Sequence, residues 1–111
     1  MNIAYWKHVA TRLESLDQDE CREALSLVKR VLEDPEKFDG VKQTFVVCHH
    51  LWGCVTRALD HGDFNEQDEA QVYALEAEMA GHVWIARLAL GWVMRSSSAP
   101  VSEPTLAEIG L

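Results

Sequence analysis

Basic residues are scarce in this sequence. Its 111 residues include 10 Lys and Arg against 18 Asp and Glu, which gives a formal net charge of −8. Phosphate backbones and anionic membranes repel a chain of this charge, so direct binding to nucleic acid or to a membrane is disfavoured. Long apolar runs are missing too, because no stretch reaches the roughly 18 apolar residues of a membrane span.

Disulfide and export signals are also missing. The three cysteines, Cys21, Cys48 and Cys54, are odd in number and fall inside helical patterns, unlike the cysteines of a disulfide framework. Residues 1–14 lack the basic start and the uninterrupted apolar run of a signal peptide. We therefore expect the protein in a reducing cytoplasm.

Catalytic motifs are absent as well. The sequence contains no Gly-rich phosphate loop, no GxSxG and no HExxH. The ExxH pairs of di-iron helical bundles are missing, and the nearest pair is Glu78 with His82 at a spacing of four. We expect no enzyme, no catalytic residue and no cofactor.

Helical periodicity, in contrast, fills most of the chain. Apolar residues recur at helical spacing over residues 2–16, 17–33, 41–61 and 65–95. The short connections between these segments favour antiparallel neighbours. We predict an all-α fold, a compact antiparallel bundle of about four helices over residues 1–95. A short flexible tail over residues 96–111 follows, with apolar spacing near its end that suits one helical turn. The alternative is that this end docks onto the bundle or onto a partner.

Residues at the segment ends predict where the helices begin and end. Asn2 and Asn65 are expected N-caps, and Asp17 followed by Glu20 has nearly the spacing of a capping box. Pro35 is expected to end the second helix, because the residue before proline avoids helical backbone angles.

Glycines are expected to shape the last two helices. Gly62 is the predicted stop of the third. The last segment would be about 45 Å long at 1.5 Å per residue. Such a length predicts a kink at Gly81 or an end near Gly91.

Acidic residues gather before and within the start of the last helix. Residues 60–78 hold seven acids and no Lys or Arg, whereas residues 40–59 and 79–102 hold no acid. One interpretation is a solvated helix start whose carboxylates complement the helix dipole. The other is a negative surface that binds a basic partner. The residues assigned to that surface are Asp63, Glu66, Asp68, Glu69, Glu76 and Glu78.

The last helix also has a second apolar face. Trp84, Leu88 and Trp92 follow one another at a spacing of four, opposite the main stripe of that helix. Exposed indole is unfavourable, so this face is either buried in the bundle or anchors a homodimer or another partner.

A Cys/His cluster lies in the third segment. His50 and Cys54 are four residues apart, as two metal ligands on one helix face would be. Cys48 lies on a different face and no CxxC or HExxH supports the pair, so core cysteines and surface histidines are the favoured interpretation. A metal-binding helical protein that uses His50 and Cys54 remains an alternative.

In size, charge and helicity the chain is similar to the small acidic helical proteins with which phages and mobile elements block host machinery. Anti-CRISPR proteins and DNA mimics are examples, and the resemblance rests on no motif. The resemblance implies a non-enzymatic inhibitor that binds a basic, nucleic-acid-binding surface of a host complex. In such an inhibitor the acidic residues would attract the basic partner, and the exposed indoles would anchor the complex. The alternative is a homodimeric structural or adaptor subunit.

Overall fold

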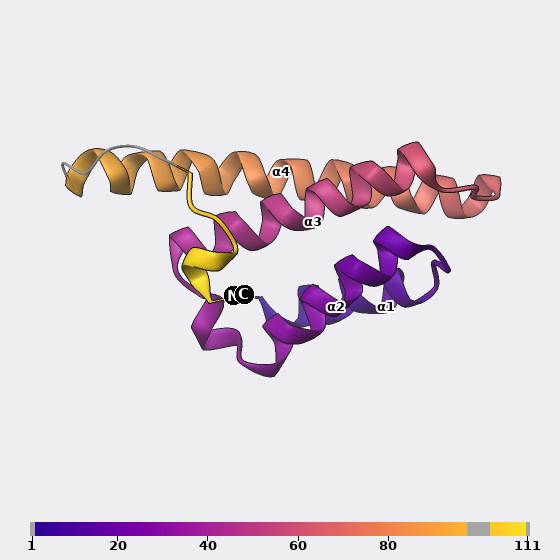
Figure 1. The fold of residues 1–111 in the computed structure, drawn as a ribbon, viewed down its shortest axis with the longest axis horizontal. Helices are drawn as coiled ribbons and strands as arrows, with labels where there is room; N and C mark the ends of the chain where they lie inside the picture. The colour runs from indigo at the N-terminus through magenta and orange to yellow at the C-terminus, as the bar shows by residue number, and fades with distance from the viewer. Residues whose placement is uncertain (1, 98–102, 111) are drawn as a thin grey trace.

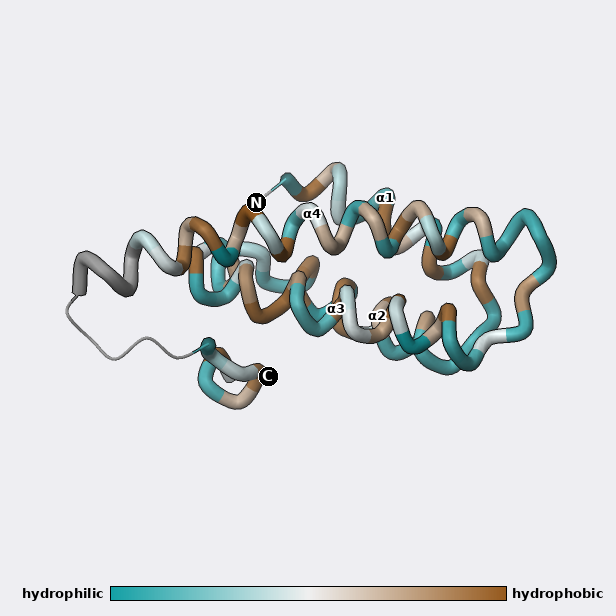
Figure 2. The backbone as a smooth tube through the Cα atoms, turned by 90° about the horizontal axis from the view of Figure 1, so that it is seen from above, coloured by the Kyte–Doolittle hydropathy of each residue, from teal (hydrophilic) through white to brown (hydrophobic). Residues whose placement is uncertain are grey.

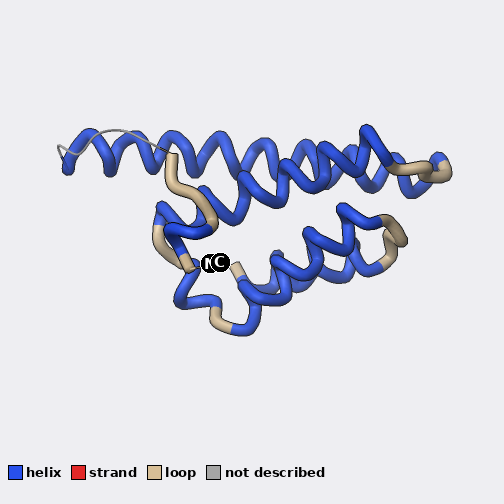
Figure 3. The backbone as a smooth tube through the Cα atoms, in the orientation of Figure 1, coloured by secondary structure: helices blue, strands red, loops and turns tan. Residues whose placement is uncertain are grey.

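The computed structural model describes residues 2–97 and 103–110, with side chains for residues 2–92 and 103–110. Over these residues the chain forms helices joined by short loops, and no strand (Figure 3). The prediction of an all-α bundle of about four helices is confirmed. The helices are α1 (Ile3–Glu14), α2 (Asp19–Glu33), α3 (Val41–His61) and α4 (Glu66–Ser97), with 3₁₀ helices η1 (Pro35–Phe38) and η2 (Ala107–Ile109).

The four α-helices form two stacked antiparallel hairpins. In Figure 1, α1 and α2 lie below α3 and α4, and α4 extends past the start of α3. The view from above places α1 along α4 and α2 along α3 (Figure 2). The molecule measures 48 × 26 × 22 Å. Each helix therefore packs against the next in sequence, and α1 and α4 close the bundle.

Two of the three predicted N-caps are confirmed. The Asn2 side chain accepts a hydrogen bond from the backbone N–H of Tyr5 at 3.0 Å. The Asn65 side chain accepts one from the N–H of Asp68 at 2.8 Å. Both satisfy backbone donors that a helix start otherwise leaves without a partner.

The predicted cap of α2 is wrong by one residue. Gln18, not Asp17, holds the N-cap position, and its side chain accepts from the N–H of Cys21 at 3.0 Å. Asp17 instead forms an ion pair with Arg22. The longer Gln side chain can reach the same donor, which the preference for short polar caps did not anticipate.

The stops are partly as predicted. α2 ends at Glu33 before Pro35, and α3 ends at His61 before Gly62. α4 runs without interruption for 32 residues, past Gly91, and Figure 1 shows no sharp bend along it, so the predicted kink at Gly81 or end near Gly91 is wrong. A glycine weakens a helix by only about 1 kcal/mol, and α4 has buried apolar side chains on both sides of Gly81, such as Met79 and Val83.

The core centres on α3. Eight of its 21 residues are buried, because α3 packs against α2 on one side and α4 on the other. α4 buries a single stripe against it. Among the residues of α4 whose side chains are described, the buried ones are Val72, Leu75, Met79, Val83, Ala86 and Leu90.

The described part of the C-terminal segment packs against the bundle. η2 is the predicted helical turn, and its Ile109 is buried beside α3. Ion pairs join Glu108 to Lys42 at 3.5 Å and Glu103 to Arg87 at 3.0 Å. Residues 103–110 therefore lie against the bundle, held by the buried Ile109 and these two ion pairs. Of the rest of the predicted tail, Ser96 and Ser97 belong to α4, and residues 98–102 and 111 lie outside the described residues.

Candidate functional site: the outward face of α4

The second apolar face of α4 is exposed. The exposed fractions are 61% for Trp84, 67% for Ile85, 57% for Leu88 and 71% for Trp92. The alternative in which this face is buried within the bundle is therefore wrong for the protomer, because α3 and not α4 occupies the centre. Four neighbouring large apolar side chains on one helix face form the kind of patch that marks interaction sites.

Small residues continue this face toward the start of α4. Ala70, Ala74, Ala77 and Gly81 are all exposed. With the large residues that follow, successive positions are separated by four, three, four, three, four and four residues, close to the spacing of a helix–helix seam. We call this set the outer seam: Ala70, Ala74, Ala77, Gly81, Trp84, Leu88 and Trp92.

Gly81 has no explanation within the protomer. A Cβ atom placed on Gly81 would meet nothing within 4 Å. Glycine inside a helix is about 1 kcal/mol less favourable than alanine, and here it neither bends α4 nor makes room for another part of the same chain. The sequence suggested a kink, whereas the structure leaves open space in the middle of the outer seam.

A hollow of about 480 Å³ adjoins the outer seam, between α1, the start of α3 and α4. Ile85 and Ala89 form its rim on the α4 side, and Val41 lines it from α3. Tyr5 and His82 supply polar atoms at its edge. An apolar hollow with a few polar groups is the usual form of a binding site, here continuous with the exposed face.

A hydrogen-bonded network beside this hollow joins α1 to α4. The Arg12 guanidinium donates to both Glu78 carboxylate oxygens, at 3.0 and 2.6 Å. The Tyr5 hydroxyl donates to Glu78 Oε1 at 3.2 Å and lies 2.8 Å from His82 Nε2. The hydrogen bonds from Arg12 lower the Glu78 pKa. Burial, with the nearby Glu78 charge, raises the Tyr5 pKa. The network therefore holds a carboxylate and a neutral phenol in place.

Two of the six acids assigned to a partner surface have partners within the protomer. Glu78 belongs to the network with Arg12. Glu76 accepts a hydrogen bond from the indole N–H of Trp52 on α3 at 3.0 Å. Both carboxylates are half-buried. They contribute to helix packing, so neither belongs to a freely exposed acidic surface.

The other four acids surround the connection between α3 and α4. Asp63, Glu66 and Glu69 are exposed, and Asp68 is half-buried. Fifteen residues of helix separate Glu69 from Trp84, or about 22 Å at 1.5 Å per residue. Figure 2 shows hydrophilic positions (teal) around this connection and hydrophobic ones (brown) along the other half of α4. The predicted acidic and aromatic sites therefore lie at different ends of α4.

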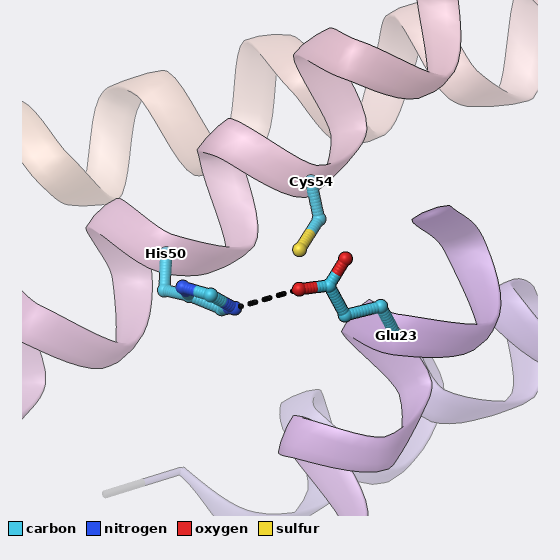
Figure 4. Close-up of side chains that lie close together, drawn as sticks. All are labelled: Glu23, His50 and Cys54. Carbon is cyan, nitrogen blue, oxygen red and sulfur yellow. Dashed lines mark ion pairs between the residues drawn. The ribbon is translucent and has the colours of Figure 1, made fainter. Parts of the chain in front are cut away.

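The structure brings His50 and Cys54 together and adds a third residue, Glu23 of α2 (Figure 4). Sequence reasoning missed Glu23, because the polar face of α2 gives no sign of which acid faces α3. Cys54 is buried, which raises its pKa to about 11. Cys21 and Cys48 are buried free thiols as well.

Comparison of the chain with protein-family models, curated proteins and solved structures finds no match. Among the described helices, none has the length and apolar character that a membrane crossing requires. The arrangement of the side chains is thus the basis on which a function can be argued.

Proposed function

We propose that the protein is a non-enzymatic interaction module that works as a symmetric homodimer, in which two copies pair antiparallel along their outer seams. The observation that carries this proposal is the exposed seam itself, with helix-pairing spacing, small residues at one end and large ones at the other. Trp84 and Leu88 are 61% and 57% exposed, so covering the exposed part would recover about 1–2 kcal/mol for each side chain.

Side-chain size favours the antiparallel orientation. With the two-fold axis near Gly81, Leu88 would face Ala74 of the second copy, and Trp92 would face Ala70. Large residues of each copy would then fill the space over small residues of the other, as close packing requires. At the axis, the two Gly81 residues would let the helix backbones approach closely, which supplies the missing reason for a glycine there.

Charge favours the same orientation. The acids of α4 lie in its first half, whereas residues 79–102 contain none. In an antiparallel pair, the first turn of one copy, with Glu66 and Glu69, would lie beside the acid-free last turns of the other. A parallel pair would place like charges against one another. Because each chain has a net charge of −8, an arrangement that keeps the acids of the two copies apart reduces the repulsion between them.

The exposed area is of the right size. The indoles of Trp84 and Trp92, 61% and 71% exposed, present about 330 Å² if a whole Trp side chain offers about 250 Å². The seam from Ala70 to Trp92 is about 33 Å long. A stable interface buries about 800 Å² on each partner, which this length of helix together with the adjoining hollow can supply.

The test is the molar mass in solution, by light scattering after size-exclusion chromatography over 10–200 μM. The wild type should have twice the chain mass of 12.5 kDa. Leu88→Glu should be monomeric, because it places two carboxylates in the seam. Gly81→Leu should also be monomeric, because its side chain would fill the space at the axis.

Ile3→Gln is the control, since Ile3 is an exposed apolar residue of α1 outside the seam, and this variant should dimerise like the wild type. Circular dichroism checks that every variant is folded. A wild type that stays monomeric at 200 μM would overturn the proposal. A Gly81→Leu variant that dimerises as tightly as the wild type would overturn the proposed alignment of the two helices, in which the two Gly81 residues face each other at the axis.

The exposed acids favour a second candidate function, binding to a Lys/Arg-rich surface, as an inhibitor of a nucleic-acid-handling complex would. It is supported by Asp63, Glu66 and Glu69, which are exposed in a stretch with no Lys or Arg. The Glu66→Lys/Glu69→Lys variant should associate more slowly than wild type with a ten-residue lysine peptide. Glu33→Lys/Glu36→Lys changes the net charge equally at another surface. Equal slowing by both variants would argue against a localised acidic site.

A further inference from the structure

Three side chains of different chemistry meet between α2 and α3. His50 and Cys54 lie on successive turns of α3, and Glu23 of α2 faces them (Figure 4). Their ligand atoms all lie within 4.8 Å of one another, and His50 Nε2 is 3.4 Å from Glu23 Oε1. Imidazole, thiolate and carboxylate are the three ligand types that zinc takes in proteins.

We propose that Glu23, His50 and Cys54 bind one divalent transition-metal ion of the zinc type. Ligand atoms in a tetrahedral zinc site lie about 3.5 Å apart, given metal–ligand bonds of about 2.0–2.3 Å. Since all the ligand atoms here lie within 4.8 Å of one another, the widest separation has to shrink by at most about 1.3 Å. Rotation of the Glu23 side chain, which is exposed, supplies that movement. Cys54 coordinates as the thiolate and releases its proton to the solvent.

A positive group already lies between two of the three ligands. Arg57 Nη2 is 3.3 Å from Glu23 Oε2 and 3.6 Å from Cys54 Sγ. The carboxylate and the sulfur thus converge on one cationic nitrogen, close to where a metal ion would lie. About half of the Arg57 side chain is exposed, so it can turn into solvent when the ion enters. Arg57 is a competitor of the metal and not a ligand.

Solvent can reach the site from the α2 side. A hollow of about 280 Å³ borders Glu23 and His50, whereas Cys54 is fully buried behind them. The ion would enter past Glu23 and keep a water molecule in its fourth position, as zinc with three protein ligands does. With one ligand on α2 and two on α3, the bound ion would link the two hairpins. It would thereby stabilise the folded chain, because the unfolded chain does not hold the three ligands together.

The site is independent of the proposed dimer, because His50 and Cys54 lie on the side of α3 that faces α2, Glu23 belongs to α2, and none of the three belongs to the outer seam of α4. The test is a titration of the untagged, chelator-treated full-length protein with Co²⁺, followed by displacement with Zn²⁺. One Co²⁺ per chain should bind with a thiolate-to-cobalt charge-transfer band, and one equivalent of Zn²⁺ should abolish that band. Zn²⁺ should also raise the melting temperature.

Variants separate this site from adventitious binding. Glu23→Gln should weaken Zn²⁺ binding at least tenfold, and Cys54→Ala should remove the charge-transfer band. Arg57→Leu should tighten binding several-fold, because the competing cation is gone. The matched control is Glu20→Gln. Glu20 pairs with His61 across the same two helices at 3.1 Å, so this variant should bind like the wild type.

An absent charge-transfer band in the wild type would overturn the proposal. Equal affinities for Glu23→Gln and the wild type would overturn it too. Because Glu23 is exposed, its variant remains a valid test even if the buried Cys54→Ala variant does not fold.

Discussion

The Arg12–Glu78 pair joins α1 to α4, the two helices farthest apart in the sequence. Replacing Glu78 by Gln keeps the shape of the side chain and removes the charge that accepts both Arg12 hydrogen bonds. The Tyr5 hydroxyl loses its charged acceptor as well. The perturbation therefore acts on one defined network and leaves the apolar core unchanged.

The exposure of the two partners sets the magnitude. The Arg12 side chain is 18% exposed and that of Glu78 is 35% exposed. Fully exposed pairs contribute about 0.2–1 kcal/mol, whereas removal of one partner of a buried pair costs about 3–5 kcal/mol. The cost of removing one partner from a half-buried, bidentate pair such as this should lie between these two ranges. We expect Glu78→Gln to lower the free energy of unfolding by about 1.5 kcal/mol, or the melting temperature by about 6 °C.

The assay is a double-mutant cycle with Arg12→Gln, measured by urea unfolding at one fixed protein concentration, since dimerisation would make stability depend on concentration. We expect a coupling free energy of about 1 kcal/mol between the two positions. Glu69→Gln, an exposed acid of the same helix, should change stability much less. A coupling below about 0.3 kcal/mol would refute the role assigned to this pair.

The free energy of unfolding should also depend on pH through Glu78 and on close packing at Gly62. Arg12 lowers the Glu78 pKa from its ordinary 4.5, so this stabilisation is complete above pH 4.5 and is lost as the pH falls through the folded-state pKa. The difference in unfolding free energy between wild type and Glu78→Gln should therefore shrink below pH 4.5, and a difference that stays constant down to pH 3 would contradict this. At Gly62, an added Cβ would press against Phe64 and stand 2.6 Å from the Ala58 carbonyl oxygen. Gly62→Ala should thus cost about 1–3 kcal/mol in thermal unfolding, and a wild-type melt would show that the backbone can relax.

Gly62 follows the end of α3 as predicted, but the physical reason for glycine at this position differs from the expected one. Sequence rules favour glycine after a helix because it adopts positive φ. Here φ is −79°, and what excludes a side chain is the nearness of Phe64 and of the last turn of α3. The position could be predicted, but its cause depends on where the chain goes next.

The number of helices, most of their ends and the inward stripe of α4 followed from the sequence alone. The stripes predicted for the other helices were only partly right, because Ile3 and Val41 are exposed whereas Leu51 is buried. The features that were predicted correctly depend on interactions within a few residues of one another, such as the Asn2 and Asn65 caps, the break before Pro35 and the 3.6-residue period. Even the exposed acids at the start of α4 could be placed this way.

Only the tertiary structure decided which faces meet. Periodicity gives the direction in which a side chain points from its own helix axis, but not which helix lies there. It could not show that α3 rather than α4 is central, and hence that Trp84 and Leu88 are exposed. It could not show that Glu78 faces Arg12, or that Glu23 faces His50 and Cys54. Each of these pairings depends on how the two hairpins stack, which is decided by burial summed over the whole core.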